Sequence, residues 1–304
     1  MLICDTHADT LYALQDETRD QSQPCDITLE RLTAGGETDT RVQCLALWTG
    51  KEGLLGKDVG LIDREMLALG RLEAQGFRQV RTVDEAQPGK ANFLLTIEGG
   101  EVFEGGPQTV DAFALWGARI AAIVWNNENS FACPAAVGND RGLTQRGQKL
   151  VEHMNAQHIA VDVSHLNDAG VKDLLSLSKT PIIASHSCCR ALCNHPRNLT
   201  DDQLKAIFTM GGYVGINFYP LFLKGEQQAT IDDLILHIDH MVDLGGAEHI
   251  GMGSDFDGID SHPVGLEHAG CVHALFDRMK ERGYDDVAIR NFAGENFRRY
   301  LEKV

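Results

Sequence analysis

The chain has 304 residues, a hydrophobic fraction of 43% and a formal net charge of −17; apart from the acidity, this is ordinary for a globular enzyme. The acidity argues against binding to nucleic acids or to anionic membrane surfaces, because both attract basic proteins. No apolar run reaches the ~20 residues that span a bilayer, and a charge at Asp5 comes too early for a secretion signal. We therefore expect a cytoplasmic protein whose eight cysteines are reduced thiols.

Eight short apolar runs divide the sequence and predict buried β-strands, and polar residues follow most of them. The runs cover residues 2–4, 42–48, 93–97, 120–125, 159–163, 181–184, 213–218 and 249–253. Helical spacing of apolar residues is found between them, at 63–75, 143–157, 167–177, 204–210, 230–244 and 267–282. Asn167 and Thr200 are predicted helix N-caps, the second in a capping box with Gln203.

The alternation of strands and helices favours a TIM-type (β/α)8 barrel with parallel strands. We find no linker, repeat or low-complexity tract, so we expect one domain over residues 1–304. An open doubly wound sheet is the alternative, although no Gly-x-Gly-x-x-Gly follows a strand, which weakens a dinucleotide-binding version of it. In a barrel the reactive groups gather at the carboxyl ends of the strands, where the polar residues lie here.

Six of the residues that end these runs are of types that bind metal ions. They are His7, Asp9, Glu98, His165, His186 and Asp255. His7 and Asp9 stand two residues apart and point to one side of a strand, so we assign them to one divalent ion, with His165 and His186 on a second. Glu98 is the predicted bridge, because a carboxylate offers two oxygens. This set of nitrogen and oxygen donors suits two zinc ions, with manganese or iron as alternatives.

Two ions that share a water would make hydroxide near neutral pH and polarise a carbonyl group. Asp255 is not needed to complete either ion site, so we expect it to carry the proton to a leaving nitrogen. Arg197 is either a clamp for a substrate carboxylate or part of a surface ion pair. We expect Asp5 to hold the metal ligands in place without binding a metal itself. Asp162 could have the same role, and the sequence does not decide this. The other histidines are expected on the surface or in packing: His153, His158, His195, His237, His240, His249, His262, His268 and His273.

Several of these pieces occur together in one known family. The matching segments are Asp5-Thr-His-Ala-Asp-Thr10, Ile97-Glu-Gly-Gly100, Asp162-Val-Ser-His165, Ala184-Ser-His-Ser187, Arg197-Asn198, Gly215-Ile-Asn-Phe-Tyr219, Gly253-Ser-Asp-Phe-Asp-Gly258 and Gly294-Glu-Asn-Phe297. With this order and spacing, the chain resembles the membrane dipeptidase (renal dipeptidase) family of binuclear zinc peptidases, in its soluble bacterial form. The resemblance covers nearly the whole chain.

The resemblance implies a metal-dependent barrel that hydrolyses dipeptides, often with a D residue at the C-terminal position, and that forms homodimers. By motif, the five ligands assigned above correspond to the family's zinc ligands, and Glu98 corresponds to the residue that bridges the two ions. Asp255 corresponds to the catalytic aspartate, Arg197 to an arginine that binds the substrate carboxylate, and Tyr219 to a tyrosine near the substrate.

The chain departs from the family at the end of its fourth predicted strand. The renal enzyme has a Thr-His pair there, and its His contacts the substrate near the oxyanion. Val124 and Trp125 occupy that place here, followed by Asn126-Asn-Glu-Asn129. An indole donates one hydrogen bond and cannot become cationic, so oxyanion stabilisation falls to the metals or to Asn126 or Asn129.

Two other functions remain open. A different barrel amidohydrolase, such as a deaminase or an enzyme acting on an N-acyl amino acid, would commonly have His-x-His on the first strand and a bridging Lys. His7-x-Asp9 with Glu98 speaks against it. A non-catalytic metal-binding or ligand-binding protein would leave Asp255 idle.

Overall fold

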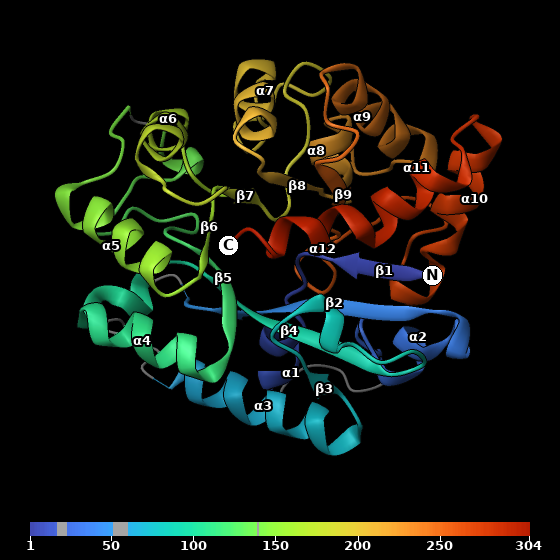
Figure 1. Ribbon diagram of the computed structural model, residues 1–304, viewed down its shortest axis with the longest axis horizontal. Coiled ribbons are helices and arrows are strands. Elements are labelled where there is room, and N and C mark those ends of the chain that lie inside the picture. Colours follow the sequence, from blue (N-terminus) through green and yellow to red (C-terminus); the bar gives the residue numbers. More distant parts are fainter. Residues whose placement is uncertain (17–22, 51–59, 139) are drawn as a thin grey trace.

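The computed structural model describes residues 1–16, 23–50, 60–138 and 140–304. Eight parallel strands close into a barrel, with helices around it (Figure 1). The strands are β1 (Leu2–Asp5), β2 (Thr40–Trp48), β4 (Ala91–Glu98), β5 (Ala118–Ala122), β6 (Ala160–Asp162), β7 (Ile183–Ala184), β8 (Tyr213–Ile216) and β9 (Ile250–Met252). Strand β2 lies between β1 and β4, and β9 pairs with β1 to complete the circle. A short strand, β3 (Arg78–Gln79), is added beside β4.

This arrangement confirms the predicted (β/α)8 barrel, and the open doubly wound alternative is wrong. Each predicted run overlaps a strand of the barrel, but several strands end earlier than the run does. The run at 120–125 overlaps β5, which begins at Ala118 and ends at Ala122. The residues after it, Ile123 to Trp125, leave the hydrogen-bonded ladder and carry Trp125 and Asn126 to the mouth of the barrel.

Helices cover the barrel, and two of them begin at the predicted N-caps. They are α1 (Thr10–Gln15), α2 (Leu29–Thr33), α3 (Leu61–Gln75), α4 (Pro107–Trp116), α5 (Gln145–Ala156), α6 (Asp168–Leu177), α7 (Asp201–Thr209), α8 (Pro220–Leu223), α9 (Ile231–Asp243), α10 (His273–Glu281), α11 (Asp286–Arg290) and α12 (Asn296–Leu301). Short 3-10 turns occupy Gly36–Thr38, Val83–Glu85, Glu101–Gly105, Ala135–Val137 and Ala269–Cys271, and a π-helical turn occupies Asn291–Glu295. Asn167 caps α6 by accepting from the Gly170 amide at 2.8 Å, and Thr200 and Gln203 form the predicted capping box of α7.

The amino ends of the strands are closed by the C-terminal helix. Tyr213 on β8 is buried against Phe297 and Tyr300 of α12, with ring centroids 5.3 Å and 5.8 Å apart. Gly251 on β9 makes room for it, since a Cβ there would lie 2.1 Å from the Tyr213 hydroxyl. Because apolar side chains fill this end, a substrate can approach only from the carboxyl ends of the strands.

Candidate metal centre and active site

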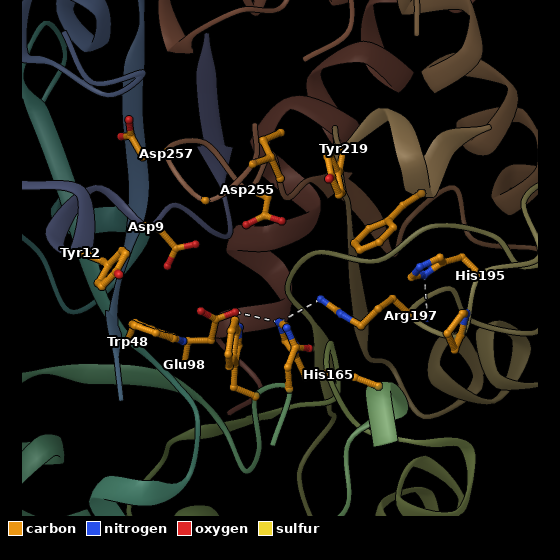
Figure 2. A pocket seen from close by; sticks show the side chains of 17 residues that line it. Asp9, Tyr12, Trp48, Glu98, His165, His195, Arg197, Tyr219, Asp255 and Asp257 are labelled. Carbon is orange, nitrogen blue, oxygen red and sulfur yellow. Dashed lines mark hydrogen bonds and ion pairs between the residues drawn. The ribbon is translucent and has the colours of Figure 1, made fainter. Parts of the chain in front are cut away.

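The six predicted metal-binding and catalytic residues, of which Asp9, Glu98, His165 and Asp255 are labelled in Figure 2, meet at the carboxyl ends of five strands. They are His7 and Asp9 after β1, Glu98 at the end of β4, His165 after β6, His186 after β7 and Asp255 after β9. All six are at least 92% buried, the most exposed being Asp9 and Asp255 at 8%. Side chains as distant in the sequence as His7 and Asp255 thus form one cluster.

The Glu98 carboxylate lies at the centre of this cluster. Its Oε1 atom is 3.5 Å from His7 Nε2, 2.8 Å from His165 Nε2 and 3.6 Å from His186 Nε2. The same Nε2 atom of His7 also lies 3.6 Å from Asp9 Oδ2 and 3.8 Å from Asp255 Oδ1. Among the described carboxylates, Glu98 is therefore the one with an oxygen near all three imidazoles.

The donor atoms fit divalent metal ions. Glu98, His165 and His186 bring three donor atoms within 4.8 Å of one another, and so do His7, Asp9 and Glu98. His7 Nε2 and Asp9 Oδ1 are buried and have no hydrogen-bond partner among the described residues. A buried polar atom without a partner costs free energy, and a cation between imidazole and carboxylate donors removes that cost.

In His165 and His186, hydrogen bonds at Nδ1 place the ring proton on that nitrogen, which faces away from Glu98. The Asn126 carbonyl oxygen lies 3.0 Å from His165 Nδ1, so that nitrogen donates and Nε2 is left as an acceptor. The Ser185 hydroxyl lies 2.8 Å from His186 Nδ1 and donates to Asp162 Oδ2 at 2.5 Å. Because burial and the nearby cations Arg197 and His7 lower the pKa of both imidazoles well below the ordinary value, both are neutral, as metal binding requires.

Two buried aspartates hold the ends of neighbouring strands together. Asp162 accepts hydrogen bonds from the backbone amides of Ser164 and Ser185 and from both hydroxyls. Asp5 accepts from the Ser254 hydroxyl at 2.5 Å and from its amide at 2.9 Å. Asp5 thus supports the turn that presents Asp255, as expected, and Asp162, left open by the sequence, supports the segment that carries His186.

The carboxylates at the centre strongly affect one another. Although burial opposes protonation of His7, Glu98 and Asp9 raise its pKa to about 10. Burial and the charge of Asp9 raise the pKa of Glu98 well above its ordinary value. Burial also raises the pKa of Asp255 to about 6, while Asn217 donates to its Oδ2 atom at 2.9 Å. The clustered negative charge of these carboxylates favours the binding of metal cations.

Arg197 lies in the cavity and not on the surface. Its side chain is buried, its Nη2 atom is 3.0 Å from His165 Nε2, and its guanidinium lies 5.5 Å from the Phe222 ring centroid. The Nη1 atom has no hydrogen-bond partner among the described residues. The predicted surface ion pair is therefore wrong, and a guanidinium donor is available to a bound anion.

A cavity of about 680 Å³ lies over the cluster, and the remaining predicted site residues line it. These are Trp125, Asn126 and Tyr219. Asn129 is engaged elsewhere: its amide donates to the Ile123 carbonyl at 2.9 Å, and its oxygen accepts from the Phe131 and Ala132 amides. Of the two asparagines considered for the oxyanion, only Asn126 lines this cavity.

The sequence did not predict several residues of the cavity wall. They are Tyr12, Trp48, His195, Phe222 and Asp257. His195, expected on the surface or in packing, lines the cavity and accepts from the Arg197 amide at 3.2 Å through Nδ1. Trp48 is the last residue of β2 and Asp257 follows β9, so position at a strand end could have identified both.

Comparison with known proteins identifies the family. A model of the membrane dipeptidase family, peptidase family M19, matches residues 1–304. The chain belongs to this family. An uncharacterized dipeptidase of Schizosaccharomyces pombe is 36% identical over 207 residues, which are 67% of this chain and 51% of that relative. The chain thus spans about half the length of this yeast protein.

Two solved structures share the fold over essentially the entire chain. A dipeptidase AC described as an M19 metallopeptidase has a TM-score of 0.87 and 28% identity, covering 100% of this chain and 98% of its own. A metallopeptidase from Rhodobacter sphaeroides, liganded with a phosphinate mimic of the dipeptide L-Ala-D-Ala, has a TM-score of 0.86 and 26% identity, covering 100% and 99%. The resemblance seen in the sequence is confirmed, and it indicates metal-dependent dipeptidase activity. A search of the described helices finds none with the length and hydropathy needed to cross a bilayer.

Proposed function

We propose that this chain is a zinc dipeptidase that holds two ions at the barrel mouth and cleaves dipeptides, including those with a C-terminal D residue. The observation that carries the proposal is the Glu98 carboxylate, with Oε1 within 3.6 Å of three imidazole nitrogens. His7 and Asp9 would hold one ion, His165 and His186 the other, and Glu98 both. Two divalent ions in such a site would acidify a water that serves as the nucleophile and would polarise the peptide carbonyl as Lewis acids.

Asp255 is the proposed proton carrier. Asn217 holds its Oδ2 atom, which leaves Oδ1 directed toward His7 and the centre of the cluster. With a pKa of about 6, the carboxylate is ionised at neutral pH and still basic enough to accept a proton. It would then deliver that proton to the amine nitrogen that leaves.

Arg197 is the proposed anchor of the substrate carboxylate. Its unpartnered Nη1 atom and its position over the Phe222 ring support this role. A guanidinium at a fixed distance from Glu98 measures the length of the substrate, so a tripeptide would place the wrong bond at the reacting position. The side-chain oxygen of Asn126 is held by His165 Nδ1, and its amide hydrogens remain as donors for the carbonyl oxygen of the substrate.

The acidic cavity wall distinguishes a dipeptide from an N-acyl amino acid. Asp255 and Asp257, which hold no ion in this proposal, line the cavity, and a free ammonium group is attracted to them. An N-acyl amino acid carries the carboxylate that Arg197 would hold but no ammonium group. We therefore expect dipeptides to be preferred over their N-acetyl analogues.

A substrate panel with added zinc tests the proposal. The panel contains L,L and L,D dipeptides, their C-terminal amides, N-acetyl amino acids and tripeptides. We expect hydrolysis of free dipeptides only. Equal rates on tripeptides or amides would contradict the dipeptidase function, and a preference for N-acetyl amino acids would favour the other amidohydrolase function.

The same proposal includes a single domain over residues 1–304, a cytoplasmic location and a homodimer. The described cysteines are assigned to no disulfide, which supports a reducing compartment. Family membership supports the continuous domain.

A further inference from the structure

A row of three aromatic side chains forms one wall of the cavity. Tyr12 on α1, Trp48 at the end of β2 and Trp125 after β5 meet edge to face, with ring centroids 4.5 Å apart for Tyr12 and Trp48 and 4.9 Å for Trp48 and Trp125. The Trp125 ring in turn lies 6.1 Å from the His165 ring. This aromatic row therefore runs from the cavity rim to the edge of the metal cluster.

The aromatic row is not ordinary core packing. Tyr12 is 40% exposed, and both tryptophans are partly exposed to the same cavity. The third tryptophan of the chain, Trp116, lies on α4 and does not line this cavity. Rings that pack edge to face and stay open to a cavity offer an apolar surface to a ligand.

The position of the aromatic row relative to Arg197 tells which end of a dipeptide would touch it. Figure 2 shows Tyr12, Trp48 and Asp9 on one side of Glu98 and His165, and Arg197, His195 and Tyr219 on the other. With the substrate carboxylate on Arg197 and the reacting carbonyl at Glu98, the N-terminal residue extends toward the aromatic row. The carboxylate of Asp257, which lies on this side as well (Figure 2), suits its ammonium group.

We propose that the aromatic row of Tyr12, Trp48 and Trp125 is a subsite for a large apolar side chain on the N-terminal residue of the substrate. This inference rests on the proposed dipeptidase function and adds the class of dipeptide that is preferred. A side chain that lies against these rings loses contact with water, which favours binding of apolar groups. Each additional methylene group in such a pocket changes kcat/KM by about 10–200-fold. We expect Leu and Phe at the N-terminal position to be favoured over Ala by about 10–100-fold in kcat/KM.

Two series of dipeptides test the subsite by activity. Ala-Gly, Leu-Gly and Phe-Gly vary the N-terminal residue, and Ala-Gly, Ala-Leu and Ala-Phe vary the C-terminal one. In Trp125→Ala and Tyr12→Ala we expect the Phe-Gly to Ala-Gly ratio to fall to within about threefold of unity, below the discrimination of a single methylene group, while the Ala-Phe to Ala-Gly ratio stays as in the wild type. Tyr12 is exposed enough to be truncated without loss of the fold, and Trp116→Phe is the matched control that changes neither ratio.

Binding of uncleaved analogues provides a readout that is independent of turnover. Phosphinate dipeptide mimics with a leucine-type or an alanine-type N-terminal side chain are titrated into Trp116→Phe while tryptophan fluorescence is recorded, because Trp48 and Trp125 are then the only tryptophans in the sequence. We expect tighter binding of the leucine-type mimic and loss of that preference in Tyr12→Ala. Equal binding of the two mimics, or a preference for Phe-Gly that survives in both alanine variants, would overturn the subsite. If no dipeptide is cleaved, the proposed function fails, and the phosphinate pair still decides the subsite.

Discussion

The hydroxyl of Ser185 gives the account its sharpest test away from the ligands themselves. It donates to Asp162 Oδ2 at 2.5 Å and accepts from His186 Nδ1 at 2.8 Å, which leaves His186 Nε2 free to bind a metal ion. Ser185→Ala removes this hydroxyl and changes nothing else in the chain. The imidazole then loses the contact that fixes its proton and its orientation.

The expected size of the effect follows from what remains after the substitution. Asp162 Oδ1 keeps three hydrogen bonds, from the amide and hydroxyl of Ser164 and the amide of Ser185, so the two strand ends stay joined. Only Oδ2 loses its donor, which costs about 1–3 kcal/mol in stability. Loss of a hydrogen bond behind a ligand weakens metal binding by about 10–100-fold, or about 1.4–2.7 kcal/mol.

The assay is competition for zinc with a chelating dye, fitted to two sites per chain. We expect Ser185→Ala to weaken one site by about 10–100-fold and to leave the site of His7 and Asp9 as in the wild type. Ser187→Ala is the matched control, because Ser187 flanks His186 on the other side and its buried hydroxyl has no hydrogen-bond partner among the described residues. Equal zinc binding by both serine variants, or equal weakening of both sites in Ser185→Ala, would refute the reasoning.

Three further substitutions test other parts of the site. Asp255→Asn should lower kcat by about 10²–10⁴-fold with unchanged zinc content, measured by steady-state kinetics and metal analysis, and full activity would show that Asp255 is not the proton carrier. Arg197→Gln should raise KM for dipeptides by about 10–100-fold and leave amides unaffected, since a charged hydrogen bond is worth about 1.5–3 kcal/mol. Burial raises the pKa of Glu65 well above its ordinary value, so wild-type stability falls as the pH rises between those two pKa values. Glu65→Gln should therefore melt higher than the metal-free wild type at about pH 8 and equally near pH 4, whereas exposed Glu73→Gln should match it throughout.

The barrel and its central cluster could be predicted from the sequence because both depend on local patterns. An apolar run followed by His or Glu predicts both a strand and the end of that strand at which the site lies, as at Glu98 and His165. Helix α4 was missed, since it begins with Pro107 and ends with two exposed apolar residues, Leu115 and Trp116, that blur its helical pattern.

Contacts between distant strands could not be predicted in the same way. Asp162 reaches Ser185 because β6 and β7 pair with Asp162 opposite Ile183, and no short-range pattern encodes that register. The cavity role of His195 likewise depends on how the loop after β7 folds back over Arg197. Burial of such loop residues is decided by tertiary packing and not by their neighbours in the chain.

The number of zinc ions bound per chain, with and without Glu98, tests the central claim most directly. Purified protein is loaded with zinc, desalted and analysed for metal, and the same is done with Glu98→Gln. We predict close to two ions per chain in the wild type, and at most one ion and no dipeptidase activity in the variant. Two tightly held ions in Glu98→Gln, or none in the wild type, would contradict a shared carboxylate at the centre of the site.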